Sequence, residues 1–138
     1  LANIDIDYEI DIQNLCLSAI KKGILMSAHD LSDGGLAVNI AESILSADDS
    51  IGASISIETK LRQDEILFGE CQSVIIATID QSDLIELMSL AKSSKLHVQT
   101  IGKVTNDSRL VINDLIDVHK SDLKQSYFNY YGDLLAIK

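Results

Sequence analysis

The sequence predicts an α+β fold in which a mixed β-sheet packs against α-helices. Residues 8–22 place apolar side chains about one helical turn apart, whereas residues 51–57 alternate apolar and small polar side chains as a half-buried strand does. Helical and extended patterns also follow one another without strict alternation, and this order favours α+β over a β–α–β succession.

Length and composition predict one acidic, soluble domain that spans residues 1–138. The chain has 138 residues, 46% of them hydrophobic, and a formal net charge of −10. No cluster of lysine and arginine supports nucleic-acid binding, and no apolar run approaches the roughly 20 residues of a membrane helix. Without a signal peptide, a cytoplasmic location is expected. The sequence opens on Leu1 rather than methionine, so we expect a fragment of a longer protein.

The first half of the chain contains the clearest element boundaries. Gly23 follows two lysines and is expected to end the helix at 8–22. An extended lead-in at 1–7 is predicted before this helix. The elements predicted after it are a short buried strand at 23–26, a helix from 36 to about 46, a polar turn at 47–50, a strand at 51–57 and a short helix at 58–68.

The second half begins with the most β-branched run of the sequence. Residues 74–79 are continuously apolar or β-branched, which is typical of a central strand buried on both faces. The elements predicted after this strand (72–80) are an amphipathic helix at 83–93, a strand at 96–104, a hairpin-like turn at 105–108 into a strand at 109–112, a short strand at 116–118, and a last helix at 122–128 capped by Ser121.

The stretch at 27–38 lies where the first predicted strand turns into the second helix. Asp30, Ser32 and Asp33 can each cap free amides at a helix start. Gly34 and Gly35 allow a ligand or another backbone to approach closely. The N-terminus of a helix favours anions, so a phosphate site is one interpretation. A well-capped helix that binds nothing would show the same pattern.

A second unusual stretch, at 67–72, places Glu70 and Gln72 just before a strand, where a loop can present them to a ligand; a solvated loop is the alternative.

His29 adjoins Asp30, but neighbouring side chains of an extended segment point to opposite faces, so a structural histidine is favoured. His97 and His119 are also interpreted as structural or surface residues.

The two cysteines, Cys16 and Cys71, are far apart without metal-like spacing, and we expect free thiols. We predict no metal site in this chain.

Two motifs resemble one known family. SAHDLSDGGLA at 27–37 resembles the S-A-H-D-x-S-D-G-G-L-A signature of the phosphoribosylformylglycinamidine synthase family, which is part of the aminoimidazole ribonucleotide synthetase superfamily. LFGECQ at 67–72 is similar to the family's L-F-x-E-x-Q segment. The resemblance covers nearly the whole chain. It departs at Val74, where the family usually has an arginine, and this puts an anion contact at that position in doubt.

The resemblance implies a domain like the C-terminal domain of aminoimidazole ribonucleotide synthetase, here the last domain of a multidomain synthase. The family enzyme is an ATP-dependent ligase of purine biosynthesis. It makes formylglycinamidine ribonucleotide from formylglycinamide ribonucleotide, ATP and glutamine-derived ammonia. ATP and magnesium belong to the full-length enzyme, and none is assigned to this domain.

The same resemblance implies that the catalytic residues lie in missing domains, so none is assigned here and the isolated chain is expected to be inactive. The residues expected to contact substrate are Asp30, Ser32, Asp33, Gly34, Gly35, Glu70 and Gln72. The implied partners are the N-terminal synthase domains, the glutaminase component and a nucleotide substrate. The isolated chain is expected to expose an apolar docking surface and to be able to pair with itself.

Two alternatives stay open at this point. One is a free-standing, non-catalytic module that binds a nucleotide or another metabolite. The other is the C-terminal domain of aminoimidazole ribonucleotide synthetase itself, although that relative has threonine and glycines where this chain has Ser32, Asp33 and Gly34.

Overall fold

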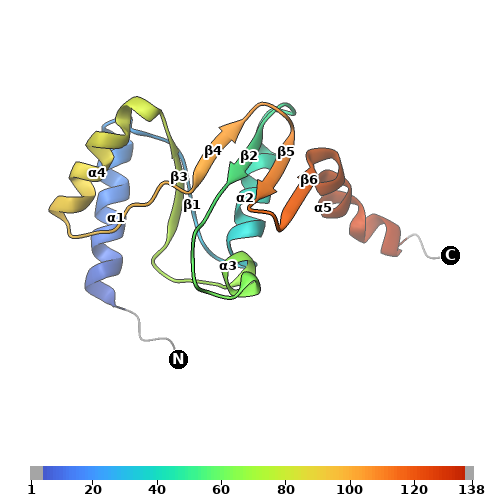
Figure 1. The fold of residues 1–138 in the computed structure, drawn as a ribbon, viewed down its shortest axis with the longest axis horizontal. Coiled ribbons are helices and arrows are strands. Elements are labelled where there is room, and N and C mark those ends of the chain that lie inside the picture. Colours follow the sequence, from blue (N-terminus) through green and yellow to red (C-terminus); the bar gives the residue numbers. More distant parts are fainter. Residues whose placement is uncertain (1–4, 136–138) are drawn as a thin grey trace. The chain divides into compact units, whose positions relative to one another are not determined.

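The computed structural model describes the backbone of residues 5–135 and the side chains of residues 5–129. These residues form two compact units (Figure 1). Unit 1 contains residues 5–33 and 70–100, and unit 2 contains residues 34–69 and 101–135. The predicted α+β class is confirmed, with helices and strands in both units.

Unit 1 is a two-stranded antiparallel sheet with two helices. Its elements are α1 (Ile6–Lys21), β1 (Leu25–Asp30), β3 (Ile75–Ile79), the 3-10 turn η1 (Gln81–Asp83) and α4 (Leu84–Ser93). α1 and α4 contact each other and lie side by side (Figure 1). Lys22, just after α1, donates from Nζ to Glu86 Oε1 on α4 at 2.7 Å. Ala19, Ile24 and Leu87 form the buried core of this unit.

Unit 2 is a four-stranded mixed sheet with three helices. Its elements are α2 (Gly35–Ser46), β2 (Gly52–Ile55), α3 (Gln63–Phe68), β4 (Gly102–Thr105), β5 (Arg109–Ile112), β6 (Ile116–His119) and α5 (Lys120–Leu135). The strand order is β4-β2-β5-β6, with β2 and β5 parallel. Leu36, Ile40 and Ile44 on α2 are buried, as are Leu110 and Ile112 on β5, since α2 packs on this sheet.

Several element boundaries differ from the predictions. α1 begins at Ile6 rather than residue 8, because the Asp5 side chain accepts from the Tyr8 N–H at 3.1 Å and caps the helix. α3 begins only at Gln63, and α5 begins at Lys120, so Ser121 lies inside the helix that it was expected to cap. The lead-in residues 1–4 lie outside the described residues.

Strand pairing differs more than the boundaries do. β4 and β5 flank the expected hairpin turn, but β2 lies between them, so they are not a hairpin. The segment 74–79 was predicted to be central and buried on both faces. Among the described residues, β3 pairs with β1 alone and its side chains are mostly half-exposed. β1 runs on to Asp30 and is largely exposed, with Met26 at 75%, where a short buried strand was predicted. Residues 96–101, predicted as strand, form none.

In the part of the chain that the structure describes, no helix has the length and apolar character needed to cross a bilayer.

Candidate functional site

Four of the predicted site residues lie in two loops at one end of the sheet of unit 1, and a fifth, Asp30, ends strand β1 there. Asp30, the last residue of β1, is the cross-strand partner of Ile75, the first residue of β3. The Leu31 N–H donates to the Val74 carbonyl at 2.9 Å and extends the pairing by one step. Since the strands are antiparallel, the loop after β1 and the loop before β3 lie together, and they contain Ser32, Asp33, Glu70 and Gln72.

These five side chains are exposed and the loops are acidic. Asp30, Asp33 and Glu70 supply three carboxylates, and segments 27–38 and 67–74 contain no lysine or arginine. Carboxylates repel a bare phosphate, so an anion would need cations from elsewhere. Among the described residues, no group of three or more histidine, cysteine, aspartate or glutamate side chains could hold a metal ion.

Gly34 and Gly35 belong to unit 2, at the start of α2. Gly34 is the N-cap residue, with φ of 80°, so the cap position itself carries no side chain. The N-cap position of α2 is therefore occupied by a left-handed glycine rather than by Asp30, Ser32 or Asp33.

The two glycines are required for different local reasons. A Cβ on Gly35 would lie 2.6 Å from the carbonyl carbon of Phe68, at the end of α3. A Cβ on Gly34 would lie 2.7 Å from a methyl group of Val38, which is a side chain that can move. Gly35 therefore permits a close approach between the backbones of α2 and α3, and this packing role accounts for the glycine without a ligand.

The sequence analysis missed a contact that holds the loop before β3. Ser73, which has φ of 59°, donates from Oγ to Glu9 Oε2 on α1 at 2.5 Å. This hydrogen bond, followed by one from Gln13, lowers the pKa of Glu9 below its ordinary 4.5. Sequence spacing gives no signal for the pair, because the two residues lie 64 positions apart.

Replacing Ser73 with alanine is expected to raise the pKa of Glu9 toward 4.5, because the largest cause of its depression is removed. A depressed carboxylate pKa contributes stability above the unfolded value, and this contribution is lost as the pH falls through the folded value. The measurement is an NMR pH titration of the Glu9 side-chain carboxyl. Ser18→Ala is the control, since the Ser18 hydroxyl donates to the Asn14 carbonyl on the same helix. An unchanged Glu9 pKa in Ser73→Ala would contradict the assignment.

Comparison with known families identifies the chain. The family model for the C-terminal domain of AIR synthase related protein matches residues 7–114, which cover most of both units. The chain belongs to this family. The resemblance inferred from the motif at 27–37 is thereby confirmed at the level of the superfamily domain.

Curated relatives and solved structures agree with this assignment. The subunit PurL of phosphoribosylformylglycinamidine synthase from Salinibacter ruber is 32% identical over 91% of this chain. The PurL subunit from Prochlorococcus marinus is 36% identical over 90% of this chain. The chain spans 17% of the length of each relative. Two Thermotoga maritima structures share the fold at 18% sequence identity. The PurLQS structure aligns with a TM-score of 0.77, and the alignment covers 89% of this chain and 22% of the matched chain. The structure of PurL with ATP aligns with a TM-score of 0.70, and the alignment covers 82% of this chain and 21% of the matched chain.

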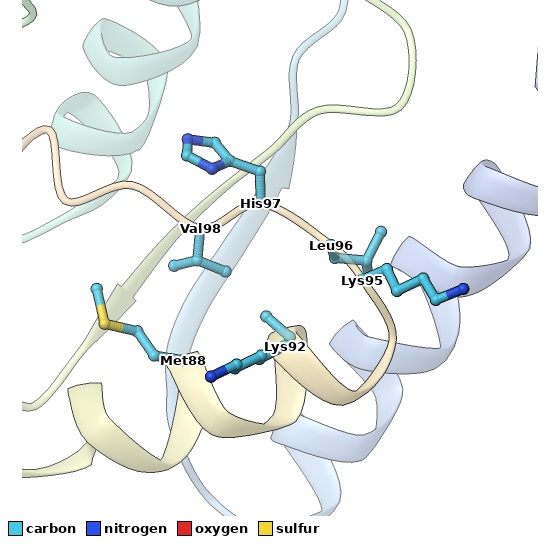
Figure 2. Close-up of a pocket in the computed structure, with 7 residues that line it drawn as sticks. Met88, Lys92, Lys95, Leu96, His97 and Val98 are labelled. Atoms are coloured by element: carbon cyan, nitrogen blue, oxygen red, sulfur yellow. The ribbon is translucent and has the colours of Figure 1, made fainter.

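A shallow pocket of about 330 Å³ opens elsewhere in this AIR synthase related domain. It lies along the end of α4 and the segment after it, and none of its lining residues was predicted as a site residue. Lys92, Lys95 and His97 border it, but Figure 2 shows their side chains pointing in different directions. The three groups do not converge on one position, so the pocket is not a built anion site.

A buried lysine was also missed by the sequence analysis. Lys120 is 2% exposed, and its Nζ donates to the carbonyls of Ala47 and Asp48 at 2.8 and 2.7 Å. These carbonyls follow the end of α2, where no further turn of helix provides N–H donors, and the Lys120 ammonium supplies the donors instead. Its role is structural.

His29 and the two cysteines complete the set of candidate side chains. His29 Nδ1 lies 2.8 Å from the Asp30 carbonyl oxygen and 3.8 Å from its carboxylate. Cys16 is half-buried, Cys71 is exposed, and both are free thiols, as predicted.

Proposed function

We propose that this chain is the C-terminal domain of a phosphoribosylformylglycinamidine synthase, which makes formylglycinamidine ribonucleotide from formylglycinamide ribonucleotide, ATP and glutamine-derived ammonia. The observation that carries the proposal is SAHDLSDGGLA at 27–37, which runs from β1 into the start of α2. The likeness of about nine-tenths of the chain to PurL subunits supports it.

Residues 1–138 act as one domain of a longer enzyme in this proposal. The family match supports this, since residues 7–114 include parts of both compact units. The domain contributes no catalytic residue and is inactive by itself. ATP and magnesium are held mainly by the other synthase domains, as the resemblance of the motif at 27–37 implies. The enzyme works in the cytoplasm.

Asp30, Ser32, Asp33, Gly34, Gly35, Glu70 and Gln72 are the residues that we propose contact substrate. The T. maritima PurL structures with ATP and with FGAR support a nucleotide-bearing site in this class of protein. The partners are the N-terminal synthase domains and a glutaminase component. The PurLQS structure of T. maritima supports assembly of this kind.

Amide chemical shifts provide the test of the substrate contacts. With formylglycinamide ribonucleotide, or with ADP and magnesium, we expect shifts concentrated at Ser32–Gly35 and Glu70–Gln72. ADP without magnesium should shift these amides less, because the carboxylates repel bare phosphates. Gln72→Ala should weaken the response, whereas Gln99→Ala, at another exposed glutamine, should leave it unchanged. Silence at saturating ligand would remove the claim that this domain holds part of the site by itself.

The genomic sequence upstream of the Leu1 codon tests the identity of the enzyme. A synthase requires several hundred preceding codons in the same reading frame, and a free-standing binding module requires a start codon close to Leu1. A start codon there would overturn the synthase proposal in favour of the module.

A further inference from the structure

Helix α1 carries a second apolar face that points away from the core of its unit. The inward face holds Ile12, Leu15 and Ala19, which are half-buried or buried. The opposite face, here named the outer strip, consists of Ile6, Ile10, Gln13, Leu17 and Ile20. Its four apolar members are 68%, 49%, 53% and 52% exposed, in chain order. A solvated helix normally carries polar residues on that face.

The spacing of the outer strip is that of a coiled-coil seam. Successive members lie four, three, four and three positions apart, which is the alternation of core positions in a heptad repeat. The single polar member, Gln13, stands at the middle of the strip. α1 has 16 residues, so the seam extends over about two heptads. Scattered surface apolar residues do not produce this register.

The two ends of α1 carry opposite charges, and this polarity favours an antiparallel pairing of two copies. The first half of α1 and its cap carry Asp5, Asp7, Glu9 and Asp11, and the helix ends with Lys21 and Lys22. Turning one copy about an axis near Gln13 brings Ile6 opposite Ile20 of the other copy and Asp7 near its Lys21. A parallel pairing would instead place the acidic halves side by side, and both helix dipoles would align unfavourably.

We propose that the outer strip is a homodimer interface in which α1 pairs antiparallel with α1 of a second copy. The interface is isologous, since the same strip of each copy forms it. Only an antiparallel pairing places the acidic first half of one α1 beside the basic end of the other. Two heptads bury a small area, so the dimer dissociates on dilution. This inference does not depend on the proposed function.

Sedimentation velocity of the 138-residue chain tests the interface. We expect a monomer–dimer equilibrium over a concentration series from about 10 µM to about 1 mM. Leu17→Glu should raise the dissociation constant about a hundredfold, because one buried leucine is lost from each copy. The matched control is Ile85→Glu on α4, where the isoleucine is 83% exposed and outside the strip. It should leave the constant within about twofold.

A chain that stays monomeric throughout would overturn the proposal and leave the strip to another segment or partner. A dimer that Leu17→Glu and Ile85→Glu weaken equally, or that neither weakens, would also overturn it. Circular dichroism should show unchanged helix content in Leu17→Glu, since Leu17 is half-exposed in the monomer.

Charge exchange tests the antiparallel direction separately. Asp7→Lys and Lys21→Asp should each weaken the dimer a few-fold, because each creates two like-charge contacts across the interface. The double variant with both exchanges should restore the dissociation constant, as it restores opposite charges at both contacts. Additive weakening in the double variant would overturn the antiparallel arrangement.

Discussion

Replacing Gly35 with alanine is expected to lower the free energy of unfolding of unit 2 by about 2–4 kcal/mol. Two independent penalties act at this position. The backbone has φ of 69°, which L-residues other than glycine adopt at a cost. The new Cβ would also meet the carbonyl carbon and Cα of Phe68 at 2.6 and 2.8 Å. Both are backbone atoms, so α3 has to move away from α2.

Gly23→Ala separates the two penalties. Gly23 has φ of 73°, but no atom lies within 4 Å of a Cβ built there, so only the conformational cost remains. We expect a loss of about 1 kcal/mol in unit 1. Hydrogen exchange at buried amides of α2 and α1 measures each unit by itself. An equal loss in the two variants would show that the close approach of α2 and α3 contributes nothing.

Replacing Lys120 with methionine is expected to destabilise unit 2 by about 1–3 kcal/mol. Methionine keeps a buried apolar stem and removes the ammonium. The carbonyls of Ala47 and Asp48 then lose the donor that reaches them at 2.8 and 2.7 Å. Removing the buried charge relieves a desolvation cost, but the two polar acceptors remain behind. The loss of their partner should therefore outweigh the relief, and urea denaturation followed by circular dichroism measures the difference.

Lys124→Met is the matched control, one turn further along α5. The Lys124 ammonium pairs with the Asp49 carboxylate, and these side chains are 40% and 85% exposed. An exposed ion pair of this kind contributes little, so the expected loss is less than about 0.5 kcal/mol. A cost for Lys120→Met no larger than that of its control would contradict the structural role of Lys120.

The sequence was a reliable guide wherever burial follows a local period. The apolar spacing of 8–22 and 83–93 predicted helices in these ranges, and Ala19, Leu87 and Ala91 are buried on α1 and α4. The alternation of 51–57 predicted a strand there, and Ala53 and Ile55 of β2 are buried. Helix and strand periods depend only on neighbours along the chain, so they can be read without the fold. The motif at 27–37 was equally informative, since together with LFGECQ at 67–72 it identified the superfamily that the family match confirmed.

Strand order and the roles of individual polar residues were decided only by tertiary structure. The turn at 105–108 has the local features of a hairpin, yet β2 lies between the strands on either side and pairs with both, antiparallel with β4 and parallel with β5. Lys120 can be buried because carbonyls 72 and 73 positions away in the sequence accept hydrogen bonds from its ammonium. Sequence by itself determined the periodic faces and the family motif of this protein. The tertiary structure determined the pairings, because each depends on a partner distant in the chain.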